Sequence, residues 1–395
     1  MKKFTGIRHR MLANFFMFLF LSMSMINFYC CSTSSKQPGN NDTLTSLYKN
    51  YEDYFKIGVA LSDKNLTDSM VTTITKRHFN SITAENAMKW EFIHPEPDRY
   101  DFEQADRFVE FGEANGMYIV GHVLIWHSQT PTWVFTDEAG NRVCRDTLLQ
   151  RMRNHIHAVV GRYKGRVHSW DVINEAVGDD GMMRKNLWYE VIGIDYVEKA
   201  FEYAHEADPD AMLIYNDYSV PSAVKRNRIL ELIRNMKAKG IRVDAVGMQA
   251  HYHLDYPFLD DLEQSIIDIA EAGCKVLITE MDINILPHPW DFEGADIAFK
   301  HENDSSVNPF PEALPDSMQK VLSDRYVSFF SIFIRHHENI DRVTLWGVQD
   351  GSSWLNFWPV FGRSNYPLLF DRSYQPKPAF WAVANLPDRI EVMEE

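Results

Sequence analysis

The sequence is poor in cysteine, with only four in 395 residues. Cys30 and Cys31 are adjacent near the N-terminus, which leaves Cys144 and Cys274 for the rest of the chain. Two cysteines cannot build a disulfide framework. Neither has a His or Cys at the spacing of metal ligands, so we expect free thiols and no metal site.

Positive charge is also scarce. The chain has 40 Lys and Arg against 55 Asp and Glu, a formal net charge of −15. Nucleic-acid binding needs a basic patch, so no nucleic-acid partner is expected. No run of like charge stands out, and the acidity is most simply that of a solvated surface. A neutral polymer remains compatible as a ligand.

Motifs of several enzyme classes are missing from the sequence. It has no Gly-rich phosphate loop, no Gly-x-Ser-x-Gly elbow and no His cluster with metal spacing. His155 and His157 are two residues apart on a predicted helix, so they cannot face one metal ion. No cofactor is expected. Aromatic residues, by contrast, are plentiful (10 Trp, 17 Tyr and 25 Phe), enough for a sizeable core.

The N-terminal segment is separate from the predicted fold. Residues 1–10 are basic and residues 11–28 are almost wholly apolar, the pattern of a secretory signal. A permanent membrane anchor is the alternative, because the apolar run is near the length that spans a bilayer. We predict a signal peptide over residues 1–30 and a flexible tether over residues 31–47.

The adjacent Cys30 and Cys31, followed by a polar stretch, resemble a bacterial lipoprotein cleavage site. Cys31 fits better than Cys30, because a small residue precedes it. Export is expected, either to the periplasm or to the outer membrane or cell surface through a lipid anchor, or else by secretion. Any contact with a membrane would be through that anchor.

From about Tyr48 onward, short apolar runs alternate with longer helical patterns, which predicts βα units and a parallel sheet. Eight runs close a (β/α)8 barrel, and no Ser- or Gly-rich linker interrupts the chain, so one catalytic domain over residues 48–390 is predicted, as a monomer. The runs are residues 56–60, 81–83, 118–124, 167–173, 211–215, 243–248, 276–279 and 343–346.

Between the predicted strands, helical periodicity is clearest over residues 148–160 and 262–270, and in a segment from Pro221, placed in the first turn, to Gly240. The Pro-rich stretch 287–315 is predicted to be a long loop at one end of a cleft.

Two of the predicted strands end in a carboxylate, Glu175 in the first case and Glu280 in the second. Burial of a carboxylate is costly unless it is paired or used. In a (β/α)8 barrel the residues just past each strand point into one shared site. We therefore expect Glu175 and Glu280 to face each other across a sugar-binding cleft.

The other strand ends also carry functional side chains. Aromatic rings, amides, imidazoles and carboxylates together suit a sugar, which stacks on Trp and hydrogen-bonds through its hydroxyls. The candidates are Glu85, Asn86, Lys89, His122, Trp126, Gln129, Asn174, Gln249, His251, Asp282, Trp346 and Trp354.

Two carboxylates that flank a glycosidic bond are the minimal machinery for its hydrolysis. Glu280 would attack the anomeric carbon, while Glu175 would protonate the leaving oxygen and then deprotonate the incoming water. Asn174 could hydrogen-bond the 2-hydroxyl, an interaction that strengthens at the transition state.

The segment 273–283, Gly-Cys-Lys-Val-Leu-Ile-Thr-Glu-Met-Asp-Ile, closely resembles the active-site signature of family 10 glycoside hydrolases, the endo-1,4-β-xylanases. The resemblance extends through segments 83–90, 121–129, 170–175, 247–252 and 345–347, in the order of that family. It implies a retaining endo-1,4-β-xylanase that cuts internal β-1,4 bonds of xylan and xylo-oligosaccharides, with Glu280 as nucleophile and Glu175 as acid/base. It also implies that the other candidates, apart from Asp282, bind xylose units, and that Asp282 and His251 form a hydrogen-bonded chain behind Glu280.

Two other functions stay open from the sequence. Other barrel glycosidases share this carboxylate layout, so a β-1,4-glucanase is one alternative. A noncatalytic glycan-binding protein is the other. Individual residues have structural alternatives as well: a helix-surface ion pair for Glu85 and Lys89, a core histidine for His122, and barrel packing for Trp126 and Trp346.

Overall fold

The computed structural model describes residues 46–289 and 301–394. The predicted signal peptide, almost all of the tether and the middle of the 287–315 stretch lie outside the described residues. The described residues form one compact unit. Among the described helices, none is long and apolar enough to cross a membrane.

The sheet is built from parallel strands whose order follows the chain closely. Eight strands close into a ring, because β1 pairs with β2 on one side and with β9 on the other, and β6 pairs with β8. This confirms the predicted (β/α)8 barrel. In chain order the strands are β1 (Lys56–Leu61), β2 (Ser81–Ala84), β3 (Tyr118–Gly121), β4 (Ser169–Asn174), β5 (Met212–Asp217), β6 (Ala245–Met248), β7 (His251–His253), β8 (Lys275–Asn284) and β9 (Ile340–Leu345).

Strand β7 has no counterpart among the predicted runs. It is three residues long and pairs only with the last part of β8, where His251 lies opposite Asp282. Both of its histidines are only partly buried, so it lacks the apolar run that identifies a buried strand. Its pairing extends the wall of the barrel beyond the closed ring.

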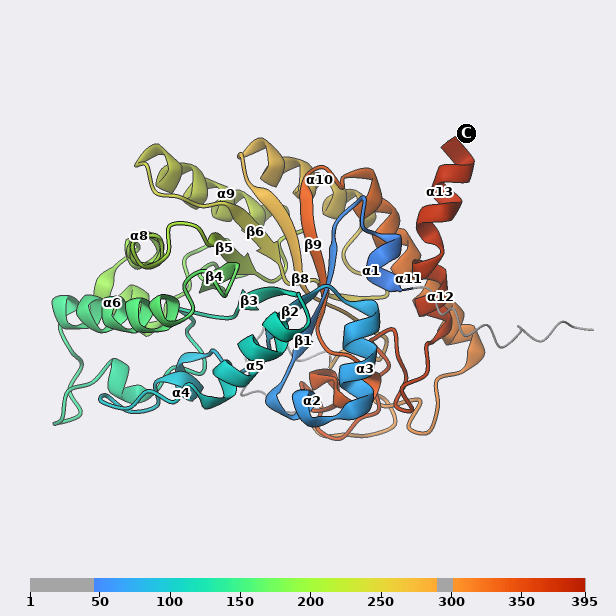
Figure 1. Ribbon diagram of the computed structural model, residues 1–395, viewed down its shortest axis with the longest axis horizontal. Helices are drawn as coiled ribbons and strands as arrows, with labels where there is room; N and C mark the ends of the chain where they lie inside the picture. Colours follow the sequence, from blue (N-terminus) through green and yellow to red (C-terminus); the bar gives the residue numbers. More distant parts are fainter. Residues whose placement is uncertain (1–45, 290–300, 395) are drawn as a thin grey trace, which may run out of the picture. The chain divides into compact units, whose positions relative to one another are not determined.

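The helices lie around the outside of the strands (Figure 1). Their bounds are α1 (Leu47–Asn50), α2 (Asp63–Thr67), α3 (Ser69–His78), α4 (Trp90–Ile93), α5 (Glu103–Ala114), α6 (Arg145–Arg162), α7 (Leu187–Ile192), α8 (Tyr196–Ala207), α9 (Ala223–Ala238), α10 (Leu259–Glu271), α11 (Asp316–Arg335), α12 (Pro378–Ala384) and α13 (Leu386–Glu394).

The helical patterns of the sequence correspond to α6, α9 and α10. One detail of the prediction is wrong: Pro221 does not lie in the first turn of α9, which begins at Ala223 after Ser222 as N-cap. The described parts of the 287–315 stretch contain no helix or strand, and α11 begins directly after Pro315.

Every residue of β4 is buried, as expected for a strand covered on both faces in a parallel barrel. Close packing beside this strand depends on Gly121 of β3. A Cβ atom at Gly121 would lie 2.1 Å from the ring of Trp170. The glycine therefore makes room for the indole between the barrel and its helices.

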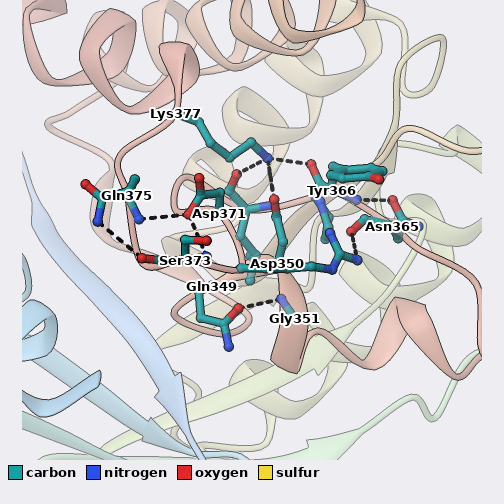
Figure 2. A network of polar contacts seen from close by, with 12 residues as sticks. Gln349, Asp350, Gly351, Asn365, Tyr366, Asp371, Ser373, Gln375 and Lys377 are labelled. Carbon is teal, nitrogen blue, oxygen red and sulfur yellow. Dashed lines mark hydrogen bonds and ion pairs between the residues drawn. The ribbon is translucent and has the colours of Figure 1, made fainter. Parts of the chain in front are cut away.

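The connection from β9 to α12 is long and is held by a buried ion pair (Figure 2). Lys377 Nζ lies 2.9 Å from Asp350 Oδ2 and donates to the carbonyl oxygens of Tyr366 and Leu368 at 2.7 Å each. The two charged side chains are 3% and 0% exposed. This connection carries Trp354, one of the predicted site residues.

Candidate active site

A cavity of about 360 Å³ lies at the carboxyl ends of the strands. All of the residues proposed from the sequence for catalysis, binding or support line it, and they come from the ends of β2, β3, β4, β6, β8 and β9 and from β7. They are Glu85, Asn86, Lys89, His122, Trp126, Gln129, Asn174, Glu175, Gln249, His251, Glu280, Asp282, Trp346 and Trp354.

Glu175 and Glu280 are each only 5% exposed and are joined by a short chain of amides. Asn174 Nδ2 donates to Glu175 Oε1 at 3.1 Å. Asn216 Nδ2 lies 2.9 Å from Asn174 Oδ1 and 2.7 Å from Glu280 Oε1. Gln249 Nε2 adds a second donor to Glu175 Oε1 at 3.0 Å. The two carboxylates thus belong to one network at one cavity.

Behind Glu280, His251 lies between two carboxylates. Its Nε2 is 3.2 Å from Glu280 Oε2 and its Nδ1 is 3.0 Å from Asp282 Oδ1. Burial alone would lower the pKa of His251, but the charge of Asp282 and the hydrogen bonds to both carboxylates raise it to about 10. The imidazole is therefore protonated and donates from both nitrogens.

This arrangement keeps Glu280 ionised. Burial alone would raise the pKa of Glu280, but the hydrogen bond from His251 and the charges of His122 and His251 lower it below the usual value. A carboxylate that is both buried and ionised is suited to act as a nucleophile.

Glu175 differs from Glu280 in how its oxygens are used. Its Oε2 atom is buried and makes no hydrogen bond within residues 46–289 and 301–394. His127 Nε2 lies 3.9 Å from this oxygen, too far for a hydrogen bond. One oxygen is thus held by two amides, and the other stays available for an incoming group.

A sequence profile of glycosyl hydrolase family 10 matches residues 46–386. The chain belongs to this family. Endo-1,4-beta-xylanase A of Xylanibacter ruminicola is 47% identical over 335 residues, which cover 84% of this chain and 91% of that protein. Beta-1,4-xylanase of Dictyoglomus thermophilum is 42% identical, over 88% of this chain and 93% of the relative. Among solved structures, a family 10 endoxylanase from a sugarcane soil metagenome has a TM-score of 0.84 at 45% identity and covers 86% of this chain and 100% of its own.

In this family 10 barrel, Glu85 and Lys89 do not form a pair on a helix surface. Both precede α4, in the connection that follows β2. Lys89 is buried, and its Nζ donates to Asn86 Oδ1 at 3.0 Å and to Gln129 Oε1 at 2.8 Å. Burial lowers the pKa of Lys89, opposed by the charges of Glu280 and Glu85. Lys89 therefore holds Asn86 and Gln129 in the cleft by hydrogen bonds and does not stabilise a helix surface.

Two residues of the family 10 cleft, His122 and Trp346, are buried, yet they line the cavity. His122 Nδ1 lies 2.8 Å from Asp171 Oδ2, and its ring is 5.4 Å from that of Trp346. Lys89 Nζ sits 4.9 Å from the ring centre of Trp126. Packing and a place in the cleft are thus compatible for these side chains.

Several cavity residues were not among the candidates chosen from the sequence. Tyr218 lines the cavity directly after β5, and Asn216, near the end of β5, links Asn174 to Glu280, so their position at a strand end was an available signal. The other cavity residues lie in β7, at the end of β8 or in irregular connections, where no apolar run marks them. They include Asp179, Ser219, Tyr252, His253, Tyr256, Asn284, His288, Leu355, Trp358 and Pro359.

Proposed function

We propose that this chain is a retaining endo-1,4-β-xylanase that hydrolyses internal β-1,4-xylosidic bonds of xylan and xylo-oligosaccharides by double displacement. The observation that carries the proposal is the pair Glu175 and Glu280, linked by amides at one cavity of a family 10 barrel. Both relatives described above are named as xylanases.

In the first step, Glu280 forms a bond to the anomeric carbon while the bond from that carbon to the leaving oxygen breaks. Glu175 gives its proton to the leaving oxygen. In the second step, Glu175 takes a proton from water, and the resulting oxygen attacks the anomeric carbon and releases Glu280. Each step conserves charge. In the first step Glu280 loses its negative charge on forming the ester and Glu175 becomes negative on giving up its proton, and the second step reverses both changes.

The remaining cleft residues would hold the xylose units. Asn174 contacts Glu175 directly and Glu280 through Asn216, a position from which it can meet the 2-hydroxyl of the sugar that Glu280 attacks. Trp126, Trp346 and Trp354 offer ring faces for stacking, and Lys89 and Gln249 offer N–H donors. Asp282 and His251 support Glu280.

The test is the substitution Glu280→Gln, which keeps the size of the side chain and removes the nucleophile. Reducing-sugar release from xylan should be abolished, while the fold, checked by circular dichroism, is retained. Glu263→Gln is the matched control, because Glu263 pairs with Arg335 on the outside of the barrel. Undiminished hydrolysis by Glu280→Gln would refute the assignment.

Comparison of rates on xylan and on cellulose oligomers separates a xylanase from a β-1,4-glucanase. A faster rate on cellulose oligomers would contradict the proposed substrate. Binding of xylan without release of reducing sugar would instead indicate a noncatalytic glycan-binding protein.

The organisation of the whole chain is part of the proposal: a signal peptide over residues 1–30, a tether over residues 31–47 and a catalytic domain over residues 48–390, exported as a monomer. The supporting observations are the basic and apolar N-terminal pattern and the adjacent Cys30 and Cys31. Protease treatment of intact cells should degrade a surface-anchored enzyme. The variant Cys31→Ser should then appear in the soluble fraction if lipid is attached there.

A further inference from the structure

The chain that follows Glu175 turns back on itself and returns to the same residue at Arg184. Gly178 N–H donates to Met182 O at 2.8 Å, and Arg184 N–H donates to Ala176 O at 2.8 Å. Arg184 Nε then donates to the carbonyl oxygen of Glu175 at 3.0 Å. The guanidinium thus closes the loop on the backbone of the proposed acid/base.

The backbone of Glu175 is in a conformation that needs such support. Its φ is +59°, in the left-handed region that residues other than glycine rarely adopt. A conformation of this kind is strained and persists only where its surroundings hold it. Glu175 N–H donates to Asn216 O at 2.9 Å, and Arg184 holds the carbonyl on the other side. The two contacts fix the peptide units on both sides of this residue.

The same guanidinium also contacts the wall of the cleft. Arg184 Nη2 donates to the hydroxyl oxygen of Tyr218 at 2.7 Å, and Tyr218 lines the cavity. Tyr218 is further held by Lys225, whose Nζ is 3.2 Å from the ring centre, and by Asp179 Oδ2 at 3.2 Å from its hydroxyl. Arg184 therefore bridges the backbone of Glu175 and a side chain that a bound sugar would touch.

We infer that Arg184 is a positioning residue for acid catalysis: it fixes the backbone of Glu175 and couples it to Tyr218, so that the carboxyl reaches the leaving oxygen. The inference rests on the proposed function. Arg184 does not itself touch the reacting atoms. Its planar guanidinium makes both contacts at once, which the single ammonium of a lysine cannot reproduce in the same geometry.

The test compares two substrates that differ in their need for an acid. Cleavage of xylohexaose requires protonation of the leaving oxygen, because a sugar alkoxide is a poor leaving group. Cleavage of 2,4-dinitrophenyl β-xylobioside does not, because dinitrophenolate leaves unprotonated. The ratio kcat/KM reports only the steps up to the first bond cleavage, so later hydrolysis of the glycosyl-enzyme does not enter the comparison.

For Arg184→Met we expect kcat/KM on xylohexaose to fall about tenfold or more, a part of the roughly 100- to 10,000-fold that general acid catalysis contributes. On the dinitrophenyl substrate it should fall less than about twofold, because only acid catalysis is disturbed. For Arg184→Lys, kcat/KM on xylohexaose should also fall more than on the dinitrophenyl substrate, but by less than in Arg184→Met. Tyr218→Phe, which keeps the ring and removes the contact with Arg184, should give a non-additive double variant with Arg184→Met.

Arg151→Met is the matched control. Arg151 is a partly buried arginine that also donates to backbone carbonyls, at 3.1 Å to Val134 and 2.9 Å to Thr136, away from the cavity. Its loss should lower stability without changing the ratio between the two substrates. Equal losses on both substrates in Arg184→Met and Arg184→Lys would overturn the inference. Failure of the wild-type protein to cleave either substrate would instead refute the proposed function.

Discussion

His251 Nε2 lies 3.2 Å from Glu280 Oε2, so a protonated His251 donates a hydrogen bond to the carboxylate that is proposed to attack the sugar. Since this bond and the histidine's charge help to hold the pKa of Glu280 below its usual value, the acidic side of the pH profile should depend on His251.

The substitution His251→Asn should move the acid limb of kcat/KM to higher pH. It removes the hydrogen bond and the charge of His251, and the remaining burial raises the pKa of Glu280. Protonation of Glu280 then begins at a higher pH, and the protonated form cannot attack. The measurement is kcat/KM on xylohexaose across the acid range. His336→Asn, on the outer surface beside Glu263, should leave the acid limb unchanged. An acid limb that stays in place in His251→Asn would show that another group controls the pKa of Glu280.

Trp354→Phe tests the next hydrogen bond in the series that runs from Glu280 through His251 to Asp282. The indole Nε1 of Trp354 donates to Asp282 Oδ2 at 2.7 Å, and Asp282 is buried. Hydrogen bonds to charged groups contribute about 1.5–3 kcal/mol, so the free energy of unfolding should fall by about that amount. Trp381→Phe, at a side chain that is 41% exposed, controls for loss of an indole. A stability equal to that of the wild type would mean that the Asp282 contact contributes little.

Lys377→Met should destabilise the protein strongly. The change leaves Asp350 buried without its ion-pair partner and leaves two carbonyl oxygens without their donor (Figure 2). Breaking a buried pair on one side costs about 3–5 kcal/mol. The measurement is the urea unfolding midpoint.

The control for this change is Lys320→Met, which removes a lysine from a pair with Asp324 whose side chains are 74% and 63% exposed. That variant should lie within about 0.5 kcal/mol of the wild type. Equal effects of the two substitutions would contradict a special role for the buried pair.

Two glycine-to-alanine substitutions should have opposite effects on stability. In Gly121→Ala the new Cβ would lie 2.1 Å from the Trp170 ring, so the strand or the indole must move, at a cost of about 1–3 kcal/mol or more. Gly161 lies within α6, and a Cβ there meets no atom within 4 Å. Gly161→Ala should stabilise the protein by about 0.5–1 kcal/mol, because alanine favours the helix. Thermal unfolding of both variants measures the difference, and a stable Gly121→Ala protein would show that the barrel wall yields easily at this point.

The eight strands of the barrel could be predicted because each is a short apolar run between helical patterns, and this pattern is local. The placement of Glu175 and Glu280 at the cavity followed from the same logic, since parallel strands bring their carboxyl ends to one edge. Strand β7 escaped prediction because its side chains are mostly polar and only partly buried. Its presence depends on pairing with the end of β8, which no local pattern records.

The sequence by itself determined the fold class and the identity of the residues at the mouth of the barrel, because periodicity and strand ends are encoded within a few neighbouring residues. Only the tertiary structure decided which of these side chains touch. Asn216 joins Asn174 to Glu280 across 42 and 64 positions of the chain, and Arg184 returns to Glu175 through a reversed loop. Such contacts depend on the register of neighbouring strands and on the path of the loops. These are set by the packing of the whole barrel, because each strand finds its position only against its partners.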